Sequence, residues 1–345
     1  MKKFLIVKIS SLGDIIHTFP VVGYLKQKFP ESQIDWIVEE SFADIVESHP
    51  DISHVYHVNT KQWRYGKNLK AFGEFRKSLK GVFYDVLFDF QGNMKSGLFT
   101  YLARTKNKVG FGWKSVSEWP NLLFTNRKIT PPLGFNIRHD YLYLVQSFLK
   151  DQHSQYEDRG VLLKITEKQK KHIEDILSRP SLVQKPWVMV CPGSAWPNKR
   201  MSAQALTTTL QNLHQQYCCS FLFVWGIEEE KRVSEKLHQQ FNDCSLVVER
   251  LTIPVLQNLM DNMHLVIAMD SLPLHLAGTT CAPTFGIFGA SSAKKYQPLG
   301  FNHSSYQGTC PYNLVFEKRC PRLRTCKTGA CIRNSNNSIK ITMEI

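Results

Sequence analysis

The chain has 345 residues, 43% of them hydrophobic, and a formal net charge of +14 at pH 7. This length and composition suit about two domains with buried cores. The charge favours an anionic partner such as a nucleic acid, a membrane surface or a phosphorylated substrate. No run of about 18 apolar residues is present to span a membrane, and Lys8 interrupts the first apolar run, so no signal peptide is expected. The nine cysteines are therefore expected to be reduced thiols.

The N-terminal stretch predicts a strand, a tight turn and a helix. Residues 4–9 are apolar and rich in β-branched side chains, as in a buried strand, and residues 15–29 are expected to be helical. Asp14 falls at the start of this helix, where an anion gains about 0.3–1 kcal/mol. It could be a general base at the sheet edge where α/β folds bind ligands, or an ordinary helix cap. Spacing alone favours the cap.

Strands and helices alternate along the rest of the chain. Further strands are predicted at 33–38, 55–58, 86–90, 187–191, 220–225, 246–248, 265–269 and 284–288. Further helices are predicted at 42–49, 140–149, 167–177 and 253–262, and from about residues 202, 228 and 270. This alternation predicts an α/β protein with two doubly wound sheets. The expected divisions are a domain at 1–180, a domain at 181–310 and a basic, Cys-containing tail at 311–345. No Gly-x-Gly-x-x-Gly follows a predicted strand, which argues against a dinucleotide oxidoreductase.

Two N-terminal motifs resemble the ADP-heptose:lipopolysaccharide heptosyltransferase family. They are Ile6-Val-Lys-Ile-Ser-Ser-Leu-Gly-Asp14 and Asp35-Trp-Ile-Val-Glu-Glu40, and the likeness extends to about residue 295. It implies the GT-B fold, in which two Rossmann-like domains face a cleft, and an inverting, metal-independent glycosyltransferase. It also implies that Asp14 is the catalytic base and that Ser10, Ser11 and Gly13 lie beside the acceptor.

The resemblance further implies the substrates and the location. The Trp36 segment favours the branch that moves the first heptose from ADP-heptose to a Kdo residue of Kdo-lipid A. A sibling that adds a later core sugar is the alternative. The expected location is cytoplasmic, at the anionic inner face of the cytoplasmic membrane. A polyanion-binding protein without activity would explain the charge alone, but no recognised nucleic-acid module is present and no nucleic-acid partner is expected.

A basic segment at residues 61–80 would suit a multiply anionic ligand, although such runs are often solvated helix faces. Resemblance implies that Arg64 and Lys67 face the phosphates and carboxylates of the lipid acceptor. Gln91 follows a predicted strand, and it could bind a sugar hydroxyl or cap the next helix. Arg138 is expected just before the helix at 140–149, at the edge of the cleft.

The donor side lies in the second half of the chain. No Asp-x-Asp metal triplet is present, so the departing diphosphate is expected to be stabilised by backbone amides and fixed cations, without a metal or cofactor. Three motifs resemble the family's donor site: Pro192-Gly-Ser with Lys199-Arg, Trp225-Gly with a following Glu, and Asp270-Ser-Leu-Pro-Leu-His275. The implied donor residues are Ser194 and Lys199 at the phosphates, Asp270, Ser271 and His275 at the pyrophosphate and heptose, Glu228 or Glu229 at the ribose, and Leu251 at the adenine.

Two positions depart from the family pattern, and the tail is unfamiliar. Leu272 stands where the family usually has Gly, and Ala290 where it has Pro. Four cysteines of the C-terminal region are spaced unlike the paired Cys-x-x-Cys of a structural zinc site, so no metal is expected there: Cys310, Cys320, Cys326 and Cys331. The basic tail is expected to pack on the first domain or to touch the membrane.

Overall fold

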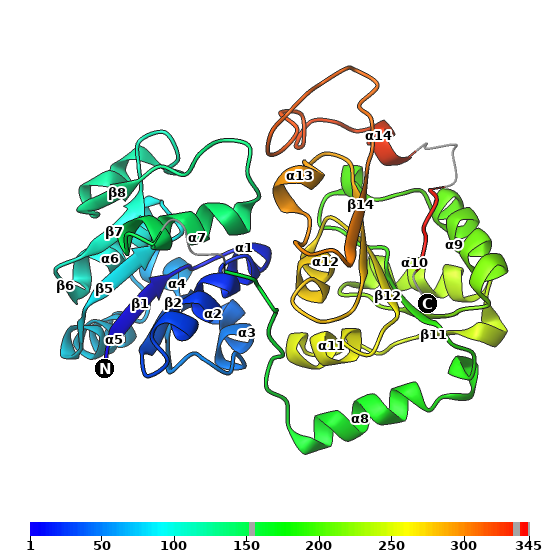
Figure 1. The fold of residues 1–345 in the computed structure, drawn as a ribbon, viewed down its shortest axis with the longest axis horizontal. Helices are drawn as coiled ribbons and strands as arrows, with labels where there is room; N and C mark the ends of the chain where they lie inside the picture. The colour runs from blue at the N-terminus through cyan, green and yellow to red at the C-terminus, as the bar shows by residue number, and fades with distance from the viewer. Residues whose placement is uncertain (152–155, 334–338, 344–345) are drawn as a thin grey trace. The chain divides into compact units, whose positions relative to one another are not determined.

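A computed structural model describes residues 1–151, 156–333 and 339–343, except for the side chain of Arg64. It divides into two compact units, Met1–Leu163 and Lys164–Ile345. Each unit contains one six-stranded sheet with helices around it (Figure 1). The expected boundary at residue 180 is therefore too late. The helix α8 (Glu167–Leu177) belongs to the second unit, where it packs against α11 (Ile253–Met260).

The first unit is built on a wholly parallel sheet. In spatial order its strands are β3 (His54–Val58), β2 (Gln33–Glu39), β1 (Lys3–Val7), β5 (Val86–Asp89), β7 (Lys108–Phe111) and β8 (Arg127–Ile129). The main helices are α2 (Phe19–Lys28), α3 (Ala43–Glu47), α4 (Thr60–Arg64), α5 (Leu69–Gly81), α6 (Met94–Leu102) and α7 (Ile137–Phe148). The short strands β4 (Phe83–Tyr84) and β6 (Arg104–Thr105) pair separately.

The two faces of this sheet are covered because side chains alternate along each strand. Leu5 and Val7 of β1 share a core cluster with Leu79 of α5 and Phe99 of α6. The preceding side chain, Phe4, points to the other face of the sheet. There it contacts Phe29 at the end of α2, with the ring centroids 5.6 Å apart. Since both faces are covered, the central strands β1 and β5 are apolar and buried over Phe4–Val7 and Val86–Phe88, as a buried parallel sheet requires.

The helix predicted at 15–29 is two helices, and this is a correction. The first, α1 (Leu12–Ile16), ends before α2 begins at Phe19. Pro20 lies in the first turn of α2, where its missing N–H is tolerated. In a continuous helix the Pro20 ring would clash with the carbonyl of Ile16. Asp14 therefore lies on a separate, five-residue helix.

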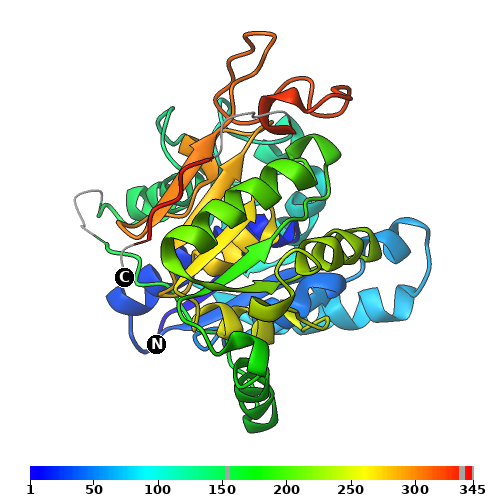
Figure 2. The same ribbon diagram turned by 90° about the vertical axis from the view of Figure 1, so that its right-hand side faces the viewer.

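The second unit repeats the same plan. Its strands, in spatial order, are β11 (Ser245–Val247), β10 (Ser220–Phe223), β9 (Trp187–Cys191), β12 (Leu265–Met269), β13 (Thr284–Phe288) and β14 (His303–Gln307). Its other helices are α9 (Ala203–Tyr217), α10 (Glu228–His238), α12 (Leu272–Ala277), α13 (Ala293–Tyr296) and α14 (Ala330–Arg333). Figure 2 shows α9 lying across one face of this sheet, where its leucines join the core.

The described part of the tail completes the second unit. Ile332, Ile339 and Ile341 are buried in the same core cluster as Val188 and Val190 of β9. These apolar side chains of the tail are therefore part of the core of the second unit.

Both sheets have the Rossmann strand order 3-2-1-4-5-6. The order reverses between β1 and β5 in the first unit and between β9 and β12 in the second. At such a switch point the loops leave neighbouring strands in opposite directions and open a crevice for ligands. None of the described helices is both long and apolar enough to cross a membrane.

Candidate active site

The turn after β1 holds Asp14 at the switch point of the first sheet. Ser11 is the N-cap of α1, and its backbone N–H and its hydroxyl both donate to Oδ2 of Asp14, at 3.3 and 2.9 Å. Asp14 is partly exposed. The capping role is therefore present, and the same bonds also fix the direction of a carboxylate that solvent or substrate can reach.

Gln91 ties the loop after β5 to this turn. Its side-chain Oε1 accepts hydrogen bonds from the backbone N–H groups of Ile9 and Ser10, at 3.0 and 3.1 Å. The cap of α6 is Asn93, whose side chain accepts from the Ser96 N–H at 3.0 Å. The alternative in which Gln91 caps the next helix is therefore wrong. Gln91 instead positions the backbone that leads to Asp14.

Asp89, at the end of β5, is a positioning residue that the sequence analysis missed. It is fully buried and accepts hydrogen bonds from the Gly92 N–H (2.9 Å), the Ser96 hydroxyl (2.8 Å) and the Asn121 side-chain amide (2.7 Å). Burial raises the pKa of the Asp89 carboxyl, and these hydrogen bonds offset part of that rise. The available signal was an acidic residue ending an apolar strand. Gly92 itself adopts φ +67°, which favours glycine.

Two cations of the first unit are buried. Lys8, 4% exposed, donates to the Phe90 carbonyl (3.0 Å) and to the Tyr141 hydroxyl (3.1 Å). Arg138 is 1% exposed and lies inside α7, whose N-cap is Asn136. Burial lowers the pKa of the Arg138 guanidinium, and the charge of Asp158 opposes that change. The expectation that Arg138 precedes the helix is corrected, because α7 starts three residues earlier than expected.

The basic segment at residues 61–80, after β3, forms most of α4, the turn after it and most of α5. Arg64 is the last residue of α4, and Lys67 is exposed in the following turn. Trp63, between the basic residues, packs on Phe72 and Phe75 with ring centroids 5.1 and 5.4 Å away. Trp63 therefore anchors the helix, while Lys67 is free to reach solvent.

The second unit concentrates charge on Asp270, directly after β12. Lys199 Nζ lies 2.5 Å from Oδ2 of Asp270, and His275 Nε2 lies 3.3 Å from Oδ1. The Ser291 hydroxyl also donates to Asp270. All four side chains are buried. Burial alone would raise the pKa of Asp270, but the hydrogen bond from His275 and the charge of Lys199 outweigh it and hold the pKa well below its usual range. Asp270 is therefore a fixed anion.

The loops on both sides of the second switch point are joined. The Ser271 hydroxyl donates to the Gly193 carbonyl at 3.1 Å, linking the loop after β12 to the loop after β9. Arg200 Nε donates to the carbonyl of Ser194 at 2.6 Å, and its terminal nitrogen bonds Glu229 at 2.7 Å. Arg200 was missed as a site residue, although it directly follows Lys199. These bonds make one rigid surface of the loop that carries Ser194 and Lys199.

The acidic start of α10 has three different environments. Glu228 is exposed and has no hydrogen bond or ion pair among the described residues, whereas Glu229 is paired with Arg200. Glu230 accepts from the Gly226 N–H at 2.8 Å, and its carboxylate lies against Gly193. A Cβ at Gly193 would come within 2.1 Å of Glu230 Oε1, so the glycine makes room for this carboxylate. Leu251 is partly buried in the loop before α11.

The departures from the family pattern fit the backbone. Leu272 is the first residue of α12 and is not among the residues with positive φ, so no glycine is needed there. Ala290 is buried, and its carbonyl accepts from the Cys320 N–H at 2.9 Å. Among the described residues, no group of three or more His, Cys, Asp or Glu side chains is arranged as a metal-ligand set.

Known proteins resemble this chain over most of its length. The sequence profile of glycosyltransferase family 9 (heptosyltransferase) matches residues 72–322. Lipopolysaccharide heptosyltransferase 1 of Campylobacter coli is 25% identical over 84% of this chain and 84% of the relative. The protein of that name from Pseudomonas aeruginosa is 26% identical over 84% and 79%. Lipopolysaccharide heptosyltransferase 3 of Escherichia coli is 21% identical over 84% of each chain.

Solved structures agree on the fold. The Escherichia coli heptosyltransferase WaaC with ADP superposes with a TM-score of 0.73 at 23% identity, covering 89% of this chain and 93% of that one. The Escherichia coli ADP-heptose lps heptosyltransferase II gives a TM-score of 0.69 at 16% identity, covering 94% of each. The predicted GT-B class, with two Rossmann-like units, is confirmed.

Proposed function

Because the chain belongs to glycosyltransferase family 9, the heptosyltransferases, we propose that it transfers L-glycero-D-manno-heptose from ADP-heptose to a Kdo residue of Kdo-lipid A. The proposed reaction inverts the anomeric carbon and uses no metal. One observation carries the proposal: each switch point presents the chemistry that one half of the reaction needs. The first unit offers the oriented carboxylate of Asp14, and the second offers the cations held by Asp270.

On the acceptor side, the Kdo hydroxyl oxygen attacks the anomeric carbon while the bond from that carbon to the ADP oxygen breaks. Asp14 accepts the hydroxyl proton. An ordinary Asp pKa of about 4 is far below that of a sugar hydroxyl, so the proton moves late, as the new bond acidifies it. The hydrogen bonds from Ser11 keep Asp14 oriented for this transfer. Ser10 and Gly13 shape the same turn, which Gln91 holds in place.

On the donor side, negative charge develops on the departing diphosphate. Ser194 and Lys199 are proposed to bind the phosphates, and Asp270, Ser271 and His275 to line the pyrophosphate and heptose. Lys199 is already fixed by its ion pair with Asp270, so little reorganisation is needed when the leaving group becomes charged. Arg200 lies in the same loop and is fixed by the Ser194 carbonyl and by Glu229.

The nucleoside contacts follow from which groups are available. Glu229 is engaged by Arg200, whereas Glu228 is exposed beside it at the start of α10. Glu228 is therefore the better candidate for the ribose hydroxyls, with Leu251 on the adenine. Exchange of Glu228→Gln should weaken ADP binding by about tenfold, as expected for a hydrogen bond to a charged group. Equal ADP affinity in the variant and the wild type, by calorimetry, would contradict this role.

The acceptor's lipid suggests a membrane-facing surface on the first unit. The neighbouring elements α6 and η2 (Trp119–Leu123) expose large apolar side chains: Met94, Leu98, Tyr101, Trp119 and Leu123. Exposed cations lie along the same stretch of chain: Lys95, Arg104 and Lys106. Each basic residue near an anionic bilayer contributes about 1 kcal/mol, and Trp suits the interface.

We propose that the protein is cytoplasmic and peripherally bound to the inner face of the cytoplasmic membrane. The basic α4 region, with Arg64 and Lys67, is proposed to bind the acceptor's phosphates and carboxylates. The protein should sediment with vesicles containing anionic lipid, and Trp119→Ser with Leu123→Ser should reduce that fraction. Equal sedimentation with neutral and anionic vesicles would contradict the proposed surface.

The deciding experiment is heptose transfer from ADP-heptose to Kdo-lipid A, with EDTA added at the start, for the wild type and Asp14→Ala. Activity in the wild type and its loss in the variant, with ADP binding retained, would support three parts of the proposal: Asp14 as the base, ADP-heptose as the donor, and a reaction that needs no metal. A wild type that is inert on Kdo-lipid A but active on an already heptosylated core would transfer the proposal to a later step. The similarity to heptosyltransferase 3 makes that acceptor the appropriate second substrate.

A further inference from the structure

Two loops of the second unit bring their side chains to one carboxylate, that of Asp270. The first loop follows β9 and contains the short 3-10 helix η4 (Pro197–Lys199), whose last residue forms the ion pair with Asp270. The second loop follows β13 and carries Ser291, whose hydroxyl donates to the same carboxylate. A third stretch of chain, residues 318–332, contacts both loops. It takes no part in the proposed reaction itself.

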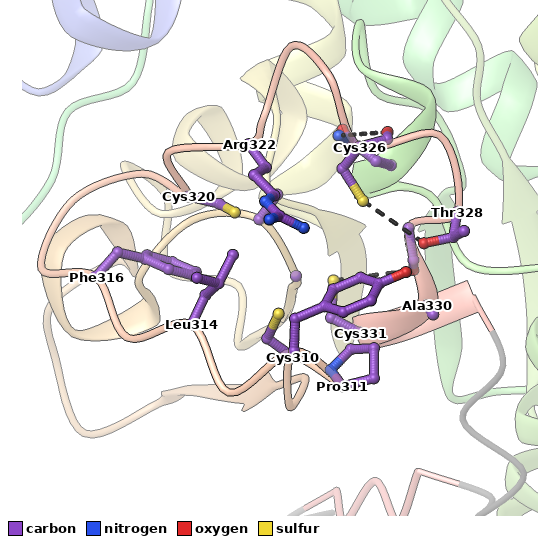
Figure 3. A pocket seen from close by; sticks show the side chains of 15 residues that line it. Cys310, Pro311, Leu314, Phe316, Cys320, Arg322, Cys326, Thr328, Ala330 and Cys331 are labelled. Atoms are coloured by element: carbon purple, nitrogen blue, oxygen red, sulfur yellow. Dashed lines mark hydrogen bonds between the residues drawn. The ribbon is translucent and has the colours of Figure 1, made fainter.

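Asn198 joins the first loop to the 318–332 segment. Its side-chain Nδ2 donates to the carbonyls of Leu323 and Cys326, at 2.7 and 3.3 Å. Gly329 adopts φ +57°, which favours glycine, and a Cβ there would come within 2.8 Å of Asn198 Cα. Figure 3 shows Cys326 beside the pocket that Asn198 and Gly329 also line. The segment therefore packs directly on the loop that carries the proposed phosphate-binding lysine.

Backbone hydrogen bonds join the second loop to the same segment on either side of Ser291. The Cys320 N–H donates to the Ala290 carbonyl at 2.9 Å. The Ser292 N–H donates to the Lys318 carbonyl, also at 2.9 Å. These two bonds fix the backbone that carries the Ser291 hydroxyl.

The 318–332 segment is itself anchored in the core of its unit. Ile332 is fully buried in the cluster that contains Val188 of β9. A Cβ on Gly289 would come within 3.0 Å of the Ile332 side chain, and a Cβ on Gly308 within 2.6 Å, so both glycines make room for it. Because its last residue is packed into the core in this way, the segment can hold the two loops in fixed positions.

The Asn198 side chain is not the one that stability alone would favour. It is 6% exposed, and its Oδ1 has no hydrogen-bond partner among the described residues. A buried acceptor without a partner destabilises a fold. The amide nitrogen, however, donates to two carbonyls of the 318–332 segment at once, which neither Asp nor Leu could do at this position.

We propose that the 318–332 segment positions the donor loops and that Asn198 is the positioning residue for Lys199. The inference rests on the proposed function, in which Lys199 binds the donor's phosphates. A cation stabilises a departing diphosphate best when it is already in place before the charge develops. The bonds of Asn198 hold the backbone next to Lys199, so binding ADP does not have to order this loop.

The test is the affinity of the full-length protein for ADP, measured by calorimetry. Asn198→Leu keeps the approximate shape of the side chain but removes both hydrogen bonds, and the Kd for ADP should rise about fivefold or more, as for coupled sites. Gly329→Ala should also raise it, because the added Cβ pushes the segment away from Asn198. Gly300→Ala is the matched control. Gly300 also has a positive φ, but it precedes β14 at the opposite end of the sheet, so ADP affinity should equal that of the wild type.

Kinetics separate positioning from a purely structural role. In Asn198→Leu the KM for ADP-heptose should rise while the KM for the Kdo acceptor stays constant, since the proposed acceptor groups belong to the first unit. A variant that is less stable to urea, but whose folded molecules bind ADP as tightly as the wild type, would overturn the proposal.

A measurement on the wild type does not depend on any variant folding. Coupling between two sites is reciprocal, so ADP should slow backbone hydrogen exchange in residues 318–332. Equal exchange in this segment with and without ADP would overturn the proposal. A wild type that does not bind ADP would overturn the proposed donor site and this inference together, whereas wild-type binding with unchanged variants would overturn only the inference.

Discussion

Asp14 and Asp270 occupy related places in the two units yet have opposite surroundings. Each follows a strand at the switch point of a parallel sheet. Asp14 is partly exposed and accepts hydrogen bonds from the neutral Ser11. Asp270 is buried between Lys199 and His275. The same fold position therefore supports two kinds of carboxylate.

The difference predicts which carboxylate can move a proton. Asp270 has a pKa held far below its usual range by its partners, so it stays ionised and serves to fix cations. Asp14 is partly exposed, and its hydrogen bonds from the Ser11 N–H and hydroxyl fix the direction of its carboxylate. The two copies of the fold thus have different proposed roles: the first carries the carboxylate for proton transfer, and the second carries the carboxylate that fixes cations.

The largest effect should come from Asp14→Asn. The amide keeps the shape of the side chain but cannot accept a proton, so kcat should fall by about 10²–10⁴-fold, the usual contribution of a general base. The free energy of unfolding should change by less than about 2 kcal/mol, the upper value for a lost cap. Steady-state kinetics and urea unfolding measure the two effects. A loss of stability in Asp14→Asn with kcat unchanged would make Asp14 only a cap.

Asp270→Asn should instead weaken the fold. It leaves Lys199 buried without its counter-ion, and breaking such a buried pair costs about 3–5 kcal/mol. Urea unfolding of the variant measures that loss. The double variant Asp270→Asn with Lys199→Met removes both charges and should recover part of the stability but not ADP binding. If the double variant is as unstable as the single one, the unpaired lysine is not the cause.

Gln91→Ala should show that the Asp14 turn is positioned from the neighbouring strand. The change leaves the N–H groups of Ile9 and Ser10 without their acceptor, at a cost of about 1–3 kcal/mol. Because the turn carries the base and not the donor site, kcat should fall while KM for ADP-heptose stays constant. Gln91→Glu retains an acceptor oxygen and should restore much of kcat. A rise in KM for the Kdo acceptor alone would instead favour a direct contact with the sugar.

The sequence predicted the elements whose pattern is local. The strands β9, β12 and β13 were placed with their observed bounds because they are short, continuous apolar runs. The interior strand β7 was missed, because it has only four residues and contains Gly110. The edge strands β8 and β14 were also missed, because their side chains are polar and partly exposed and so lack the signal of a buried strand. The turn motifs that carry Asp14, Lys199 and Asp270 were also found. Asp14 follows β1 in the first unit, and Lys199 and Asp270 follow the neighbouring strands β9 and β12 in the second.

The contacts that position these residues could not be read from the sequence. Gln91 bonds a residue 82 positions earlier, and Asp89 bonds Asn121, which lies 32 positions later. No local periodicity reports such pairings, because they depend on which strands become neighbours.

The last prediction concerns stability: the contributions of Asp89 and Asp270 to the free energy of unfolding should depend on pH with opposite signs. Burial raises the pKa of Asp89, so its contribution to stability is fully present below its unfolded pKa of about 4 and is lost as pH rises through the folded pKa. The lowered pKa of Asp270 gives the reverse, a contribution to stability that is lost only as pH falls below about 4.

Between pH 4 and 7, the wild type should therefore lose stability relative to the Asp89→Asn variant. The free energy of unfolding of the variant minus that of the wild type should rise with pH, by up to about 1.4 kcal/mol per pH unit. Urea unfolding across this range measures it, with Asp270→Asn as the comparison, whose difference from wild type should stay flat. A flat difference for Asp89→Asn would mean that its hydrogen bonds fully offset its burial.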